Sequence, residues 1–244
     1  MEASRVKSGI PGLDRMLGGG FLKNSVVAVA GGTGSGRSIF VSQFLVKGAL
    51  EFGEPGLFIS FDEQKSSIYA SLISFGWDLS ELERQQKIVF IEYPQNELSA
   101  FVEQEGAMRD LIETLGIKRV AIDSITPHSL LYSSPEERRT NTLKLVSSLR
   151  GWKATCLISA ESMPGSEHGF PHTLSGVESF ADGFIDLQFF REGGRRTRAV
   201  EIVKMRGCRH EHEIRQASIT DRGFSISQPE GEGVQKKKKP QEPL

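Results

Sequence analysis

The chain has 244 residues, of which 30 are Lys or Arg and 31 are Asp or Glu, and 38% are hydrophobic. This length and composition fit one large folded domain with a buried core. The longest apolar runs are far shorter than the roughly 18 residues of a membrane span, and the polar opening segment excludes a signal peptide, so we expect no membrane association. Cys156 and Cys208 are too few for a disulfide framework, which predicts a cytoplasmic protein.

Charge is unevenly distributed along the chain. Residues 1–190 carry 17 basic and 23 acidic side chains, a balance of −6, whereas residues 191–239 carry 13 basic and 7 acidic ones, a balance of +6. One interpretation is a solvated hairpin followed by a lysine-rich tail. The other is a basic edge that faces an acidic surface, such as that of a neighbouring subunit. The sequence leaves both open.

Short apolar runs alternate with helical patterns over the first 160 residues. The predicted strands are 25–30, 56–61, 87–92, 119–123 and 154–159. The predicted helices are 38–48, 98–115 and 135–150. Ser134, Pro135 and Glu137 form the start signal of the last helix, a capping box with proline at the first helical position. Strands that alternate with helices indicate βαβ units and therefore a largely parallel sheet in an α/β fold.

The pattern changes after Gly183. Residues 184–190 and 198–205 alternate in hydrophobicity around a Gly-Gly turn, which predicts an antiparallel β-hairpin at the edge of the sheet. A second, shorter hairpin is expected around residues 221–223. Residues 228–244 are rich in Pro, Gly, Glu and Lys, which predicts a disordered basic tail after a domain of residues 1–227.

Residues 31–38 read GGTGSGRS, which matches the phosphate-binding pattern G-x-x-x-x-G-K-[ST] except at Arg37. A predicted strand precedes this loop and a predicted helix follows it, as the motif requires. Glycines let successive backbone N–H groups converge on phosphate oxygens, and the helix N-terminus adds positive potential. The predicted nucleotide-binding residues are Gly31, Gly32, Thr33, Gly34, Ser35, Gly36, Arg37, Ser38 and Ile39.

Arg37 keeps the positive charge of the expected lysine, but its planar guanidinium is bulkier and hydrogen-bonds differently. Charge on the γ-phosphate in the transition state depends on geometry, so the substitution affects hydrolysis more than binding. We therefore predict nucleotide binding with slow turnover.

Ser38 and three further residues complete a predicted ATPase site. The Ser38 hydroxyl and the Asp123 carboxylate, which closes strand 119–123, would ligate Mg²⁺. Asp62 and Glu63 close strand 56–61 and would orient the attacking water. In a parallel sheet these strand ends lie at the same edge as the glycine loop.

The order of several motifs resembles the KaiC-like branch of the RecA-type P-loop ATPases, whose single-domain members are also called RadA paralogues. The resemblance covers residues 4–227 and rests on SGIPGLDRMLGGGF, the glycine loop, FDE, FGWD, RVAIDSIT, GVESFADGFIDL and VKMRGCRHEHEI. It implies a RecA-type α/β core that binds Mg-ATP and forms a ring, such as a hexamer, or a filament with ATP between subunits. On this match, Lys204 and Arg206 are catalytic residues that reach a neighbour's γ-phosphate.

The chain departs from that pattern at Arg37, at Asp62 where the family has glutamate, and at Ala160 near a position that is often glutamine. Three functions stay open: a slow ring ATPase in regulation or DNA-repair support, a single-stranded-DNA-binding recombinase paralogue, and a non-hydrolysing scaffold that senses nucleotide. Residues 154–190 contain no Lys or Arg, which disfavours phosphate contacts there. The DNA-binding candidates that remain are Arg138, Arg139 and the turn at 192–198.

Overall fold

The structure is a computed structural model, and it describes residues 4–93, 101, 104–163 and 171–228. The strands of its central sheet are β3 (Val26–Gly31), β4 (Gly56–Ser60), β5 (Ile88–Glu92), β6 (Arg119–Asp123), β7 (Thr155–Met163), β9 (Gly183–Glu192), β10 (Arg195–Met205), β11 (Arg215–Thr220) and β12 (Gly223–Ile226). The helices are α1 (Leu13–Met16), α2 (Arg37–Glu51), α3 (Lys65–Ile73), α4 (Leu79–Arg84), α6 (Glu105–Thr114), α7 (Thr126–Leu130), α8 (Pro135–Gly151) and α9 (Val177–Phe180).

The sheet has the order β12-β11-β10-β9-β3-β7-β6-β4-β5. Strands β9, β3, β7, β6, β4 and β5 run parallel, and β10, β11 and β12 extend the β9 side by antiparallel pairing. This arrangement confirms the predicted α/β fold with a mostly parallel sheet and antiparallel C-terminal strands. A short strand β8 (His172–Thr173) pairs with the end of β7, and β1 (Arg5–Val6) pairs with β2 (Phe21–Leu22) in a separate small sheet.

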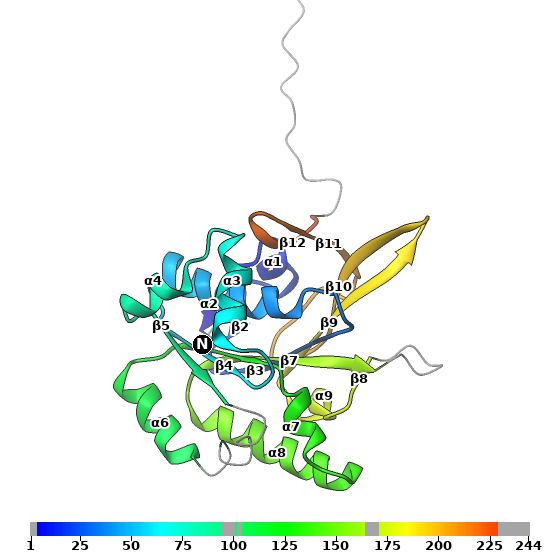
Figure 1. Ribbon diagram of the computed structural model, residues 1–244. Coiled ribbons are helices and arrows are strands. Elements are labelled where there is room, and N and C mark those ends of the chain that lie inside the picture. Colours follow the sequence, from blue (N-terminus) through cyan, green and yellow to red (C-terminus); the bar gives the residue numbers. More distant parts are fainter. Residues whose placement is uncertain (1–3, 94–100, 102–103, 164–170, 229–244) are drawn as a thin grey trace, which may run out of the picture.

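Both faces of the sheet are covered by helices, as Figure 1 shows, with α2, α3 and α4 on one face and α6, α7, α8 and α9 on the other. Strand β3 illustrates why. Val27 and Val29 pack toward α2, whereas Val26, Ala28 and Ala30 belong to the core on the α8 face, and all five side chains are buried. A strand buried on both sides requires the continuous apolar run that this sequence has.

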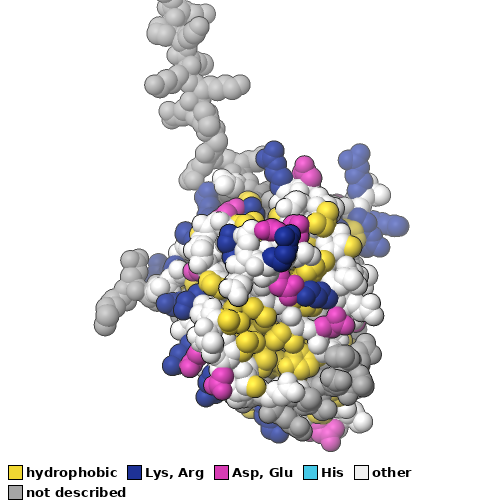
Figure 2. All heavy atoms as spheres, turned by 60° about the vertical axis from the view of Figure 1, so that its left-hand side comes forward, with side chains coloured by type: hydrophobic (Ala, Val, Ile, Leu, Met, Phe, Trp, Pro, Cys, Tyr) yellow, Lys and Arg dark blue, Asp and Glu magenta, His cyan; other side chains and the backbone are white. Residues whose placement is uncertain are grey.

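Strand β5 forms one edge of the sheet and is covered less completely. Val89 and Ile91 are half-buried and pack against the α8-side core. Figure 2, which brings this side of the molecule forward, shows hydrophobic side chains gathered in one patch. No helix among the described residues is both long and apolar enough to cross a lipid bilayer.

Several predicted boundaries are exact to within a residue or two, and others need correction. The capping box of α8 is present, because Ser134 Oγ accepts from the Glu137 N–H at 3.1 Å and Glu137 Oε2 accepts from the Ser134 N–H at 3.4 Å. Helix α2 ends three residues beyond its predicted end and β7 ends four residues beyond its predicted end, whereas their first residues differ from the prediction by one. The helix predicted at 98–115 is described as α6, and the predicted residues 98–100 and 102–103 lie outside the described part. So does nearly all of the predicted tail.

Candidate nucleotide-binding site

The glycine loop joins the carboxyl end of β3 to α2, and its conformation depends on glycine. Gly34 has a φ of 82° and Gly36 a φ of 99°, a region that other residues rarely adopt. A Cβ atom on Gly36 would also lie 2.6 Å from Ile219 Cδ1. Gly36 precedes the first residue of α2, and no side chain in the part of the chain that the structure describes caps the helix. The first N–H groups of α2 are therefore available to an anion.

The β9–β10 hairpin supports this loop from the side. Arg198 donates from Nε and Nη2 to the Gly34 carbonyl oxygen, at 3.1 and 2.9 Å. The Arg198 guanidinium also lies 4.4 Å from the centre of the Phe189 ring. Phe189 packs on the loop, since a Cβ on Gly34 would be 3.0 Å from that ring. The contact between Arg198 and Gly34 was not predicted, because 164 residues separate the two and nothing in the sequence pattern pairs them.

A cavity of about 330 Å³ lies on the α7 side of the loop. Its lining residues are Arg37, Asp62, Ser124, Thr126, Pro127, Leu130, Leu131 and Glu161. Arg37 Nη1 is buried and has no hydrogen-bond partner among the described residues. A buried guanidinium nitrogen is almost always hydrogen-bonded in a folded protein, so an unpaired one beside a cavity fits an anionic ligand.

The two predicted metal ligands lie together. Asp123 is buried at the end of β6, and its carboxylate accepts hydrogen bonds from the Ser159 and Ser38 hydroxyls. Burial raises the pKa of Asp123, although these hydrogen bonds and the nearby Arg37 charge act in the opposite direction. A carboxylate and a hydroxyl side by side offer the oxygen ligands that Mg²⁺ prefers, and a cation there would offset the cost of the buried charge.

Only one of the two residues predicted to orient water lines the cavity. Asp62 is exposed and lines the cavity with Arg37. Glu63 is also exposed, but it does not line the cavity, and its Oε2 accepts from Ser67 Oγ at 3.3 Å. The structure adds Glu161, which lines the cavity and whose backbone N–H donates to Thr126 Oγ1 at 3.0 Å. Glu161 was not among the predicted site residues, because it falls in β7 beyond the predicted strand end.

Lys204 and Arg206 lie at the other end of β3. In the pairing register, Lys204 faces Phe184 next to Gly183, and Gly183 faces Val27 near the start of β3. The glycine loop begins at the end of that strand, four residues further on, or roughly 13 Å at about 3.3 Å per residue. Lys204 and Arg206 thus stand at the edge of the sheet opposite the loop of their own chain.

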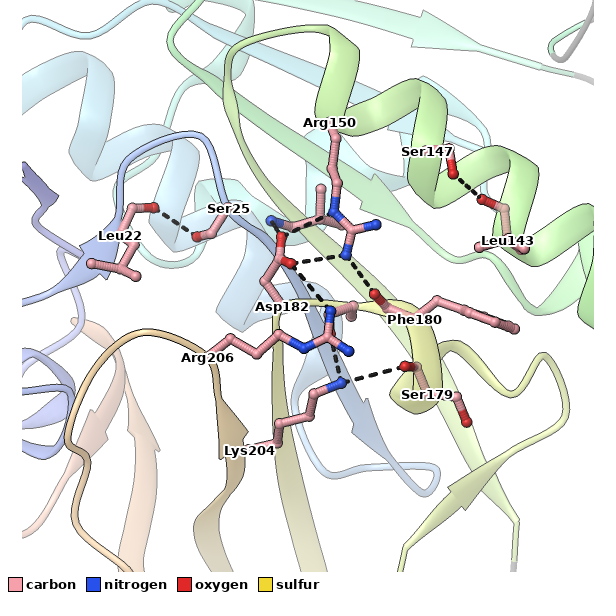
Figure 3. A network of polar contacts seen from close by, with 12 residues as sticks. Leu22, Ser25, Leu143, Ser147, Arg150, Ser179, Phe180, Asp182, Lys204 and Arg206 are labelled. Carbon is pink, nitrogen blue, oxygen red and sulfur yellow. Dashed lines mark hydrogen bonds and ion pairs between the residues drawn. The ribbon is translucent and has the colours of Figure 1, made fainter. Parts of the chain in front are cut away.

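An aspartate organises that opposite edge, and Figure 3 shows its contacts. Asp182 accepts from the Val26 N–H at 3.0 Å and from Arg150 Nη2 at 2.8 Å, and Arg206 Nη1 lies 3.8 Å from the same carboxylate. We call Asp182 and these three neighbours the Asp182 network. Lys204 Nζ donates instead to main-chain carbonyls at the end of α9, those of Glu178 at 3.0 Å and Ala181 at 2.7 Å. Burial lowers the pKa of Lys204, and the nearby Arg206 charge adds to that effect.

Comparisons with known proteins agree with this architecture. A family model described as "ATPase: KaiC" matches residues 6–231. UPF0273 protein MJ1359 of Methanocaldococcus jannaschii is 32% identical over 236 residues, which cover 91% of this chain and 96% of that protein. The circadian clock oscillator protein KaiC of Synechococcus elongatus is also 32% identical, and the match covers 91% of this chain and 44% of the longer KaiC.

A solved structure supports the same assignment. The crystal structure of the KaiC-like protein PH0186 from Pyrococcus horikoshii has a TM-score of 0.83 and 31% sequence identity, and the match covers 93% of this chain and all of that one. The matched model, the relatives and the RecA-type fold coincide over nearly the whole chain. The chain therefore belongs to the KaiC-like family of ATPases.

Proposed function

We propose that this protein binds Mg-ATP at the loop of residues 31–39 and hydrolyses it slowly, in a ring or filament that holds the nucleotide between subunits. The observation that carries the proposal is the buried Nη1 of Arg37, which has no partner within the described ranges and lies beside a cavity at the carboxyl edge of the sheet. Family membership supports nucleotide binding at this loop. Metal use, assembly and turnover are our inference from the residues around it.

Each residue group has a role in this proposal. The backbone amides of the loop hold the phosphates, and Arg37 supplies positive charge beside them. Ser38 and Asp123 hold Mg²⁺, which neutralises charge on the phosphate oxygens when it is bound. Asp62 orients the attacking water from across the cavity. Glu63 has to leave Ser67 before it can take part.

Assembly follows from the position of Lys204 and Arg206. They lie at the amino end of β3, so a head-to-tail neighbour is needed to bring them to a loop. Arg206 is the more available of the two, because its side chain is 55% exposed and its contact with Asp182 is long at 3.8 Å. Lys204 is occupied by carbonyl oxygens of its own chain. We therefore assign the contact with a neighbour's γ-phosphate mainly to Arg206.

Calorimetry and light scattering test this proposal separately. ATP in magnesium buffer should release heat on binding, and Arg37→Ala should weaken binding about tenfold or more, since it removes a charged donor from the site. Arg84→Ala, at a 73% exposed side chain, is the matched control and should bind normally. Light scattering should show a larger particle with Mg-ATP. Absence of heat with ATP and ADP would refute the binding site itself.

Arg37→Lys tests why turnover is slow. Lysine restores the compact ammonium of the usual motif, so phosphate release should rise, by up to about tenfold for a gain of about 1.4 kcal/mol in the transition state. Unchanged or lower activity would mean that Arg37 is suited to its own site.

The remaining alternatives concern what the protein does with the ATP that it binds. As a slow ATPase the protein would act in regulation or in DNA-repair support through its nucleotide-dependent assembly. The departures at Arg37, Asp62 and Ala160 favour a second candidate, a scaffold that binds ATP without hydrolysis. Tight ATP binding with no phosphate release over long incubation would select the scaffold.

A further inference from the structure

The β9–β10 hairpin extends past the glycine loop and away from the body of the molecule, as Figure 1 shows. Its register fixes which side chains share a face, because directly opposed residues of an antiparallel pair point the same way and successive residues alternate. Phe189 opposes Arg198 and Arg191 opposes Arg196. These residues alternate with the rest of the hairpin tip, so all four lie on one face. We call Phe189, Arg191, Arg196 and Arg198 the arginine strip.

The strip is basic without an acidic residue among its members. Arg191 and Arg196 are exposed and stand directly opposite each other, an arrangement of like charges that costs stability in a hairpin. Arg196 and Arg198 both lie over the Phe189 ring, at 5.4 and 4.4 Å from its centre. The strip thus combines three guanidinium groups with one aromatic ring.

The opposite face of the tip is electrically balanced. Glu192 opposes Arg195, and Phe190 opposes Thr197. The positive balance of this part of the sequence therefore falls on one face of the hairpin, a separation that only the register reveals. A partner would meet a narrow basic surface beside the glycine loop.

We propose that the arginine strip binds a single strand of nucleic acid. Guanidinium groups match phosphate oxygens in pairs of hydrogen bonds, and side chains that stack on bases give affinity for single strands without sequence preference. A second copy of this chain fits less well. The far face of the same hairpin carries Asp186, which is buried, Glu201, which is half-buried, and Glu192, which is exposed but stands opposite Arg195, so it offers little free acidic charge to the strip of a neighbour.

Arg198 connects the strip to the glycine loop. The same guanidinium that belongs to the strip donates two hydrogen bonds to the Gly34 carbonyl. A phosphate that binds the Arg198 guanidinium would compete with those hydrogen bonds and change the conformation of the glycine loop. Because coupling between two sites is reciprocal, a nucleotide at the loop would change strand affinity by the same factor. This coupling rests on the proposed ATP site, whereas strand binding by the strip does not.

Two neighbouring arginines give a matched test. Arg195 and Arg196 are both exposed at the hairpin tip, but only Arg196 belongs to the strip. Fluorescence anisotropy with a labelled oligo-dT, in nucleotide-free buffer, should show Arg196→Ala binding about fivefold more weakly or worse, with a salt slope smaller by about 0.7. Arg195→Ala removes the same charge and should bind almost as well as the wild type. Equal losses in both variants would overturn the strip.

Further probes separate the possible ligands. An oligo-U of equal length should also bind, since stacking on an aromatic ring tolerates either sugar. Inorganic polyphosphate that binds as tightly as the oligonucleotides would show an anion site with no use for bases, against the proposal. The strip would instead dock on a second copy if two results came together. The wild type would bind none of the oligonucleotides, and Arg196→Ala would have a smaller particle mass than the wild type in light scattering.

The coupling is tested last, in protein that already binds both ligands. Oligo-dT affinity should shift when Mg-ATP is added to the wild type. Arg198→Ala removes a member of the strip and a support of the loop, so it should bind both ligands more weakly. At ATP concentrations where calorimetry shows the site of Arg198→Ala filled, its weaker oligo-dT affinity should no longer shift. Strand binding without any heat from ATP would refute the proposed function and leave the strip intact. An unchanged shift in Arg198→Ala would refute the coupling through Gly34.

Discussion

The two ends of strand β3 differ in how far their polar groups are satisfied within the chain. At the carboxyl end, Arg37 keeps a buried nitrogen that finds no partner in the described part of the chain, and burial raises the pKa of Asp123. At the amino end, the Asp182 carboxylate accepts hydrogen bonds from the Arg150 guanidinium and from a main-chain N–H of β3. An incomplete set of contacts indicates a place for a ligand, and a complete set indicates a structural role.

The contrast changes how the basic residues of the amino end are understood. Lys204 and Arg206 stand two residues apart on one strand, which alone suggests an anion-binding pair. The structure shows that Lys204 holds the end of α9 and that Arg206 is only loosely engaged. Proximity in sequence therefore does not give the two residues the same role.

Asp182→Ala should have the largest effect and should act on stability alone. The substitution leaves the Val26 N–H and the Arg150 guanidinium without their acceptor, which costs about 2–3 kcal/mol in the free energy of unfolding. Urea unfolding measures the loss. Asp182→Asn keeps an acceptor oxygen and should lose less. If ATP affinity in calorimetry falls as strongly as stability does, the two ends of β3 are not independent.

Much of this arrangement could be predicted from the sequence, since it depends on local pattern. The strand, glycine loop and helix of residues 26–51, and the capping box of α8, follow from signals within a few residues of each other. Helices α3 and α4 were not predicted. The second of them has a local start signal, since Asp78 caps α4 by accepting from the Glu81 N–H at 3.0 Å.

What escaped prediction depends on contacts between distant segments. Arg198 meets Gly34, and Asp182 meets Val26 across 156 residues, only because β9 lies beside β3 in the sheet. Glu161 reaches the cavity because β7 continues beyond its apolar run. Strand order and register are therefore needed to place these side chains, and hydrophobic periodicity contains neither.

Comparing Lys204→Ala with Arg206→Ala sharpens the contrast within the amino end. Lys204→Ala should lower the free energy of unfolding by about 1 kcal/mol, because several carbonyl oxygens lose a charged donor. Arg206→Ala should cost less than about 0.5 kcal/mol, as expected for an exposed and long ion pair. Phosphate release by the assembled protein should fall mainly in Arg206→Ala. The reverse ranking in either assay would contradict the assignment.

The smallest effect is a pH dependence at the carboxyl end. His128 lies in α7, which lines the cavity through Thr126 and Pro127. The imidazole is fully buried, and neither ring nitrogen has a hydrogen-bond partner among the described residues. Burial lowers the pKa of His128, since the charged form is poorly solvated there.

A histidine with a lowered folded-state pKa contributes stability that is complete above its unfolded pKa of about 6.5 and is lost as the pH falls below that value. The free energy of unfolding should therefore decrease between pH 7 and pH 5 more steeply in the wild type than in His128→Phe, which keeps an aromatic ring against Tyr132 but cannot take up a proton. Asp182→Asn should keep the wild-type dependence in this range, because its effect arises at the other end of β3. Parallel curves for wild type and His128→Phe would mean that His128 finds a partner for its proton, and that this part of the carboxyl end is as well satisfied as the Asp182 network.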